Sequence, residues 1–149
     1  MVESKVCVDA SFMVALLVPE SFSQTALALW EEWVLGDVEI LAPALLRYEV
    51  ISALYRKGLR GLVTWEDSQA AQAQFLALDI EFQDPPALPI RAVELARLYQ
   101  RPNTYDAFYL ALVEYLDCLL WTADERLYNT VHANFGYIRW VGELPTQIT

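Results

Sequence analysis

Near the start of the chain stands the stretch KVCV (Lys5–Val8), followed directly by the acidic residue Asp9. After Lys5 the stretch is continuously apolar, without the alternation of a half-exposed strand. This is typical of a strand that has helices on both faces. Further short strands are expected at 38–42 and 118–122. Since strands covered on both faces occur in parallel sheets, these runs predict a parallel sheet flanked by helices.

Helix signals separate the predicted strands. Pro43 opens a helix that we expect to stop at Gly58, and Thr64 has the character of an N-cap before acids in the first turn. The expected strands are 5–8, 38–42, 79–83, 118–122 and 137–141. Five helices are expected at 21–35, 43–57, 64–78, 89–99 and 104–116. Two more are expected to begin near 12 and at 124. The alternation predicts one domain over 1–149, a three-layer α/β/α sandwich with a central, mainly parallel sheet.

The composition indicates a globular protein with an acidic surface. Of the 149 residues, 56% are apolar and 20% are charged, which excludes a disordered chain. The formal net charge is −10, from 20 acids and 10 bases. This balance argues against a sequence-independent DNA binder, unless acids bind a metal ion that reverses the local field.

Three features indicate a cytoplasmic protein without a membrane segment or signal peptide. Cys7 and Cys118 both fall in predicted buried strands, where free thiols of a reducing compartment are commoner than a disulfide. The longest clean apolar stretch, 12–18, is far too short to span a bilayer. The segment before it has more acids than bases, which is unlike a signal peptide.

Acidic residues follow two of the predicted strands. Asp9 comes directly after the first strand, and Asp124 comes two residues after the strand that ends near Thr122. Ligand sites of parallel sheets form beyond the carboxyl ends of the strands, so both acids are expected at one edge. Asp124 also fits the N-cap of its own helix, whereas Asp9 has no obvious capping or ion-pair role.

Two further acids lie on helices with strong apolar character. Glu49 has Leu45 and Ala53 as its i−4 and i+4 neighbours, on an apolar stripe. A carboxylate there needs an ion or strong donors, unless its head reaches water at the border of the stripe. Asp106 opens a helix that is apolar almost all round, where it either belongs to a site or simply favours the helix dipole.

Taken together, the four acids favour a site for a hard divalent cation. Clustered carboxylates repel one another unless a cation holds them together, and oxygen-only ligation suits Mg²⁺ or Mn²⁺. With one His and two strand cysteines, no structural zinc site can be assembled. The sequence also has no nucleophile elbow and no glycine-rich phosphate loop. Metal-assisted hydrolysis is the chemistry that remains.

Four motifs in order resemble the PIN-domain ribonucleases, especially the toxin half of VapBC-type toxin–antitoxin pairs. They are VCVDAS at 6–11, RYEV at 47–50, YDAFYLAL at 105–112 and TADERL at 122–127. The resemblance extends over most of the chain. It implies a single PIN-like domain over 1–149.

The resemblance also implies a function. The expected site is Asp9, Glu49, Asp106 and Asp124, binding Mg²⁺ or Mn²⁺ for hydrolysis of RNA phosphodiester bonds. Ser11 and Thr122 match positions whose hydroxyls support the metal ligands. The family further implies a homodimer and an antitoxin that covers the active-site groove.

The sequence is sparing with cations that would hold RNA. Arg126, two residues after Asp124, is the better-placed candidate for substrate binding. The densest basic group, Arg56, Lys57 and Arg60, also fits cations that favour the end of a helix.

Two other functions compete with the nuclease. A Mg²⁺-dependent phosphatase of the haloacid dehalogenase type also has an acid at a strand end. It needs a second Asp two residues later, where this sequence has Ser11. A catalytically silent PIN-like module that binds protein or RNA is the alternative from a different class.

Overall fold

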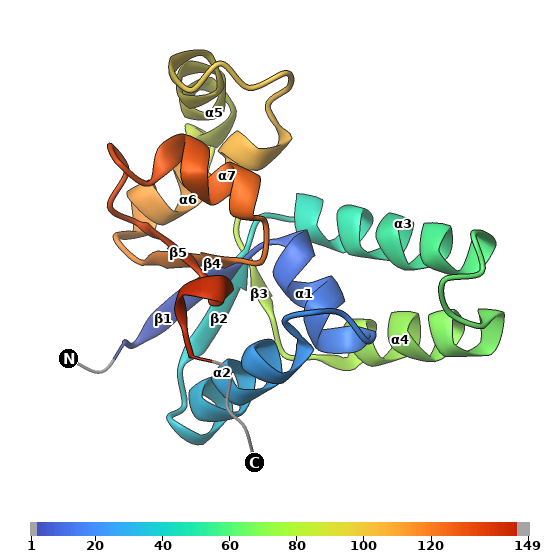
Figure 1. Ribbon diagram of the computed structural model, residues 1–149. Helices are drawn as coiled ribbons and strands as arrows, with labels where there is room; N and C mark the ends of the chain where they lie inside the picture. Colours follow the sequence, from blue (N-terminus) through green and yellow to red (C-terminus); the bar gives the residue numbers. More distant parts are fainter. Residues whose placement is uncertain (1–2, 146–149) are drawn as a thin grey trace.

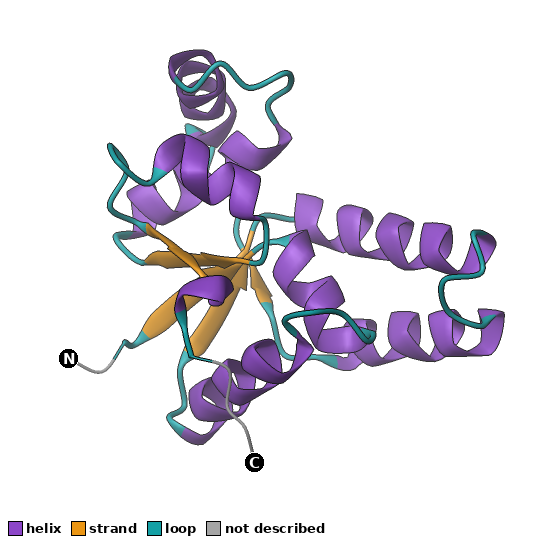
Figure 2. Ribbon diagram, viewed as in Figure 1, coloured by secondary structure: helices purple, strands orange, loops and turns teal. Residues whose placement is uncertain are grey.

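The computed structural model describes residues 3–145, built around a five-stranded sheet (Figures 1 and 2). The strands are β1 (Lys5–Val8), β2 (Glu39–Ala42), β3 (Glu81–Phe82), β4 (Leu119–Thr122) and β5 (Ile138–Trp140). Their order is β3-β2-β1-β4-β5, and all four pairings are parallel. The expectation of a mainly parallel central sheet is confirmed.

Helices cover both faces of the sheet. They are α1 (Ala10–Leu17), α2 (Ser23–Leu35), α3 (Leu45–Leu59), α4 (Trp65–Ala77), α5 (Leu88–Leu98), α6 (Tyr105–Leu116) and α7 (Glu125–Val131), followed by the 3₁₀ turn η1 (Val141–Glu143). Helices α1 to α4 contact one another on one side, and α5 to α7 lie on the other (Figure 1). The three-layer α/β/α sandwich is therefore confirmed. Among residues 3–145, no helix is both long and apolar enough to cross a membrane.

The strand order reverses direction at the centre of the sheet. From β1 the chain moves outward to β2 and β3, then returns to the other side of β1 as β4. The register pairs Val8 with Trp121, so that Asp9 and Thr122 follow on neighbouring strands at the same edge. This is the switch point at which open α/β sheets bind their ligands.

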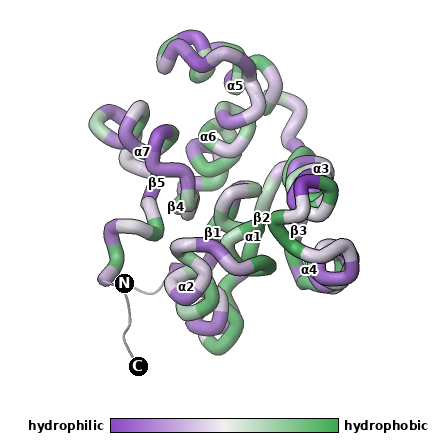
Figure 3. The backbone as a smooth tube through the Cα atoms, turned by 45° about the vertical axis from the view of Figure 1, so that its right-hand side comes forward, coloured by the Kyte–Doolittle hydropathy of each residue, from purple (hydrophilic) through white to green (hydrophobic). Residues whose placement is uncertain are grey.

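The core lies between the sheet and its helices. Val6, Cys7 and Val8 of the central strand are fully buried, and so are most apolar residues of α6. Figure 3 shows hydrophobic segments gathered about the sheet and mixed colours along the outer helices α5 and α7. This close packing fixes the ends of the strands that Asp9 and Asp124 follow.

One expected helix end is wrong. Gly58 does not stop α3, which continues to Leu59. A Cβ at Gly58 would lie 2.9 Å from Trp65 Cε3 and 2.9 Å from Ser68 Cβ, so glycine allows α3 and α4 to approach closely. The helix ends instead at Leu59 with Arg60 as its C-cap, and the next residue is Gly61, whose φ of +71° is the left-handed conformation common after a helix end.

Candidate active site

Asp9 has a structural role that the sequence did not indicate. Helix α1 begins at Ala10, two residues earlier than expected, and Asp9 is its N-cap. The Phe12 N–H donates to Asp9 Oδ1 over 3.0 Å. The expectation that Asp9 has no capping role is therefore wrong, because the strand passes into the helix with no intervening loop.

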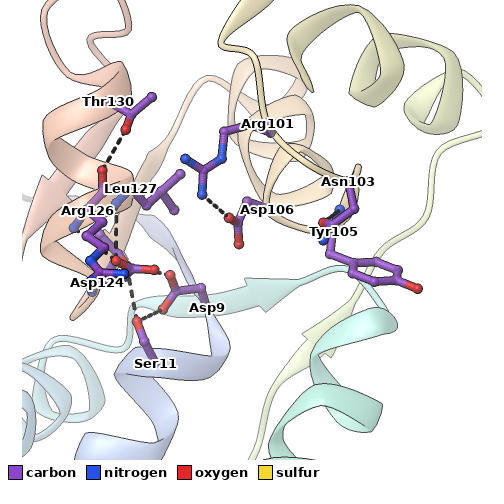
Figure 4. A network of polar contacts seen from close by, with 11 residues as sticks. Asp9, Ser11, Arg101, Asn103, Tyr105, Asp106, Asp124, Arg126, Leu127 and Thr130 are labelled. Atoms are coloured by element: carbon purple, nitrogen blue, oxygen red, sulfur yellow. Dashed lines mark hydrogen bonds and ion pairs between the residues drawn. The ribbon is translucent and has the colours of Figure 1, made fainter. Parts of the chain in front are cut away.

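Two hydroxyl groups also hold the Asp9 carboxylate. Ser11 Oγ donates to Oδ1 over 2.7 Å, and Thr122 Oγ1 donates to Oδ2 over 2.5 Å. Ser11 Oγ accepts from the Ala123 N–H, and Thr122 Oγ1 accepts from the Asp124 N–H. These bonds tie the end of β1 to the end of β4 and fix the orientation of Asp9 (Figure 4).

The environment of Asp9 disfavours its negative charge. Asp9 is only 6% exposed, and the pKa of its carboxyl group is raised to about 6. Burial is the main cause of the raised pKa and the charge of Asp106 adds to it, while the hydrogen bonds from Thr122, Phe12 and Ser11 act in the opposite direction. No basic side chain among residues 3–145 forms an ion pair with Asp9. The ionised carboxylate therefore lacks a counter-charge.

Asp124 is the N-cap of α7, as its sequence context allowed. Its Oδ1 accepts from the backbone N–H groups of Arg126 and Leu127, at 3.0 and 3.2 Å. Through Thr122, which bonds both residues, Asp124 lies beside the Asp9 network. The cap occupies one carboxylate oxygen, which leaves Oδ2 without a hydrogen bond from the described part of the chain.

Glu49 reaches the site from α3 and is half-buried on the face that carries Leu46 and Val50. Its Oε1 accepts a 2.5 Å hydrogen bond from the hydroxyl of Tyr109, a residue of α6 that is 1% exposed. Burial raises the pKa of Glu49, and the charge of Asp106 raises it too, while the Tyr109 bond opposes them. The bond joins helices from the two faces of the sheet.

Asp106 lies in the first turn of α6 and affects two of the other three acids. Its charge raises the pKa of Asp9 and of Glu49, which places it within electrostatic range of each. Arg101, in the loop before α6, donates from Nη2 to Asp106 Oδ2 over 2.9 Å. Figure 4 shows this pair facing the Asp9 network from the other side of the site.

The structure thus gathers the expected acids around one edge without packing them together. Among residues 3–145, no three acidic, histidine or cysteine side chains lie close enough to hold an ion as they stand. The donors nevertheless fit a hard divalent cation, because they are all carboxylates and Asp9 lacks a counter-charge. Mg²⁺ keeps several of its waters and needs only one or two direct carboxylates.

The two candidate groups of RNA-binding cations lie in different places, one beside the acidic site and one at the far end of α3. Arg126 is exposed in the first turn of α7, two residues after Asp124. The group at the end of α3 lies away from the strand edge (Figure 1), and two of its members have partners. Lys57 pairs with Glu20 at 2.7 Å, and Arg56 donates to Ser52. Its position favours the structural interpretation.

Sequence reasoning missed Tyr109 and Arg101. Tyr109 lies one helical turn after Asp106, and this spacing could have placed it on the same face. Arg101 lies five residues before Asp106 in a loop, where no periodicity indicates direction. Its position depends on the turn that ends α5.

The comparisons with known proteins agree with this architecture. The PIN domain family matches residues 6–132. No curated protein sequence matches the chain significantly. Three solved structures illustrate the shared fold.

The first is PAE2754 from Pyrobaculum aerophilum, at 22% identity and TM-score 0.67, covering 95% of this chain and 94% of that one. VapC20 from Mycobacterium tuberculosis, described as a toxin that cleaves the sarcin–ricin loop, has 22% identity and TM-score 0.66, with 90% and 98% covered. VapBC-1 from nontypeable Haemophilus influenzae has 13% identity and TM-score 0.58, with 91% and 96% covered. At these identities the likeness is one of fold. The family match spans most of the sequence and includes Asp9, Glu49, Asp106 and Asp124, so the chain belongs to the PIN domain family.

Proposed function

We propose that this protein is a metal-dependent endoribonuclease, the toxin of a toxin–antitoxin pair. The observation that carries the proposal is Asp9, a buried carboxylate at the end of the central strand. It has three hydrogen-bond donors but no basic partner among residues 3–145. A buried charge of this kind needs a cation. The PIN family match supports a nuclease.

The residues that would hold Mg²⁺ or Mn²⁺ are Asp9, Glu49, Asp106 and Asp124. When bound, the ion would activate a water and neutralise charge on the phosphate oxygens. In the overall reaction, hydroxide from water would add to phosphorus, and the departing sugar oxygen would leave with the proton.

The surrounding side chains prepare these ligands for binding. Ser11 and Thr122 orient Asp9, and Tyr109 orients Glu49, so the carboxylates do not have to be ordered when the ion binds. Arg126, exposed beside Asp124, is available to contact RNA phosphates.

An antitoxin and a second copy of the chain are the proposed partners. Structures of similar fold include a toxin described as cleaving the sarcin–ricin loop and a VapBC protein, which supports an antitoxin as partner. The net charge of −10 favours an antitoxin segment with basic residues. We propose a cytoplasmic homodimer. Light scattering of the purified chain measures its oligomeric state.

Labelled RNA tests the activity. Single-stranded and structured RNAs are incubated with protein and Mg²⁺, Mn²⁺ or EDTA. We expect cleavage that requires the metal and is lost in Asp9→Asn. The asparagine carbonyl keeps the helix cap, and its amide can donate to Thr122, whose hydroxyl can then donate to Ser11 at 3.1 Å.

Asp37→Asn is the matched control. Asp37 is exposed in the turn between α2 and β2, with a φ of 56° that asparagine also adopts. This variant should cleave as the wild type does. Cleavage by Asp9→Asn at the wild-type rate would exclude the proposed site. A folded protein that binds metal but cleaves none of the RNAs would favour the silent module.

A further inference from the structure

The loop between α5 and α6 carries Arg101, whose side chain extends to Asp106 of the acidic site. Helix α5 ends at Leu98 with Tyr99 as its C-cap, and the following Gln100 adopts the left-handed conformation, at a φ of 53°. The Arg101 N–H then donates to Ala96 O over 2.8 Å, and the Gln100 N–H donates to Arg97 O. This hydrogen-bonded end fixes the backbone of Arg101, so its side chain starts from a defined point.

The Arg101 guanidinium is partly buried and incompletely paired. Its side chain is 19% exposed, against 36% for Asp106, and their closest atoms are 2.9 Å apart. Arg101 Nε is buried without a hydrogen-bond partner among residues 3–145. A guanidinium has five N–H groups, and the one recorded bond uses only one of them. The group therefore retains donors for another anion.

Its charge opposes that of a metal ion at the same carboxylates. Of the ion pairs among residues 3–145, only Arg101–Asp106 involves one of the four acids. A cation that neutralises Asp106 weakens the attraction of this site for a second cation. Conversely, a bound divalent ion removes much of the reason for Arg101 to remain on Asp106.

We propose that Arg101 is an exchangeable counter-cation, which neutralises Asp106 before a divalent ion binds and contacts the RNA phosphate once the ion has replaced it. The inference rests on the proposed function, because it takes the acidic site as the metal and RNA site. The sequence has only ten basic residues against 20 acids, so few cations can bind RNA phosphates. The proposal assigns one of these contacts to Arg101. Its planar donors match two phosphate oxygens at once.

The exchange predicts opposite effects of one substitution on metal and on RNA. In Arg101→Gln, calorimetric titration should give a dissociation constant for Mn²⁺ at least about threefold lower than in the wild type. The same variant should raise KM for labelled RNA at least about threefold, because the phosphate contact is lost. A merely structural residue would weaken both interactions together.

Arg91→Gln is the matched control, since Arg91 also forms an ion pair with a carboxylate of α6 but lies at the other end of that helix. It should change neither the Mn²⁺ affinity nor KM. Arg101→Lys keeps the positive charge and should therefore bind Mn²⁺ with the affinity of the wild type. This variant provides a second test if Arg101→Gln does not fold. Thermal melts verify that each variant is folded.

Mn²⁺ affinity in Arg101→Gln that equals or falls below that of the wild type would overturn the exchange. If the wild type binds Mn²⁺ and cleaves RNA, only this inference is lost. If the wild type binds no Mn²⁺ and cleaves no RNA, the proposed function fails with it.

Discussion

An arginine–carboxylate pair lies at each end of the packed helices α5 and α6, and the two pairs are built differently: Arg91 bonds across the two helices, whereas Arg101 bonds to α6 from the loop that follows α5. At one end, Arg91 donates from Nε and Nη2 to both oxygens of Glu114, at 2.7 and 3.0 Å, and from Nη1 to Glu94. At the other end, Arg101 makes a single bond to Asp106 and has a buried Nε without a partner in residues 3–145.

This difference indicates that the Arg91–Glu114 pair is structural, whereas Arg101 has donors that can bind a further anion. The Arg91 guanidinium already donates three hydrogen bonds to two carboxylates, which leaves few donors for another anion. Its partner benefits from the contact, since the Arg91 hydrogen bond lowers the pKa of Glu114. Arg101 instead makes one hydrogen bond, to Asp106, and most of its donors are unused. Geometry, and not the mere presence of an ion pair, distinguishes the two ends.

The largest expected contrast is in catalysis. Asp106→Asn should reduce RNA cleavage at least about 100-fold, because it removes a proposed metal ligand and frees Arg101. Glu114→Gln should leave cleavage within about twofold of the wild type, because it changes only the far pair. Initial rates with labelled RNA at saturating Mn²⁺ measure both. Equal losses in the two variants would erase the functional distinction between the ends.

The pH dependence of stability should also differ in sign between the two regions. The raised pKa of Asp9, about 6 against an ordinary 3.8, means that the folded protein binds its proton more tightly than the unfolded chain does. This contribution to stability is complete below pH 3.8 and is lost as the pH rises through 6. Glu114, with a lowered pKa, contributes stability above its ordinary value that is lost on acidification.

Urea unfolding of metal-free protein at pH 5 and pH 7.5 tests this sign. Relative to the wild type, Asp9→Asn should gain on the order of 1 kcal/mol in unfolding free energy between the lower and the higher pH. Glu114→Gln should show no such gain, because its missing group titrates in the opposite direction. A difference between Asp9→Asn and wild type that does not vary with pH would mean that Asp9 is ionised without penalty.

The smallest expected effect concerns the ion pair between Arg91 and Glu114. Arg91→Gln should lower the unfolding free energy by roughly 0.5 kcal/mol, because Arg91 and Glu114 are both substantially exposed, at 43% and 34%. The loss should shrink at high salt, where exposed ion pairs are screened. Urea unfolding at 0.05 and 1 M NaCl measures it. A loss that does not vary with salt would assign the contribution of Arg91 to packing of its methylene groups.

The fold was predictable because the pattern of apolar runs is local. The VCV run before Asp9 predicted a strand covered on both faces, and β1 is the central strand of a parallel sheet. The acids at the ends of β1 and β4 could be assigned to one edge for the same reason, since parallel strands place their carboxyl ends together.

The details that failed depend on contacts between distant segments. Gly58 looked like a helix stop, but the reason for the glycine is Trp65 and Ser68 on the next helix. Asp9 looked free of a cap because the strand passes directly into α1. The pairing of Tyr109 with Glu49 joins residues 60 positions apart on opposite faces of the sheet, and no local pattern encodes it.

The tie between Asp9 and Thr122 has a consequence for when activity arises during synthesis. The two residues are 113 positions apart, and Thr122 belongs to the fourth of five strands to leave the ribosome. Until β4 has emerged and docked beside β1, Asp9 lacks its Thr122 and Ser11–Ala123 connections, and Asp106 and Asp124 are not yet held near it. A chain released before β4 would therefore lack the assembled acidic site, so the proposed activity would arise only after Thr122 and Asp124 have been synthesised and β4 has docked.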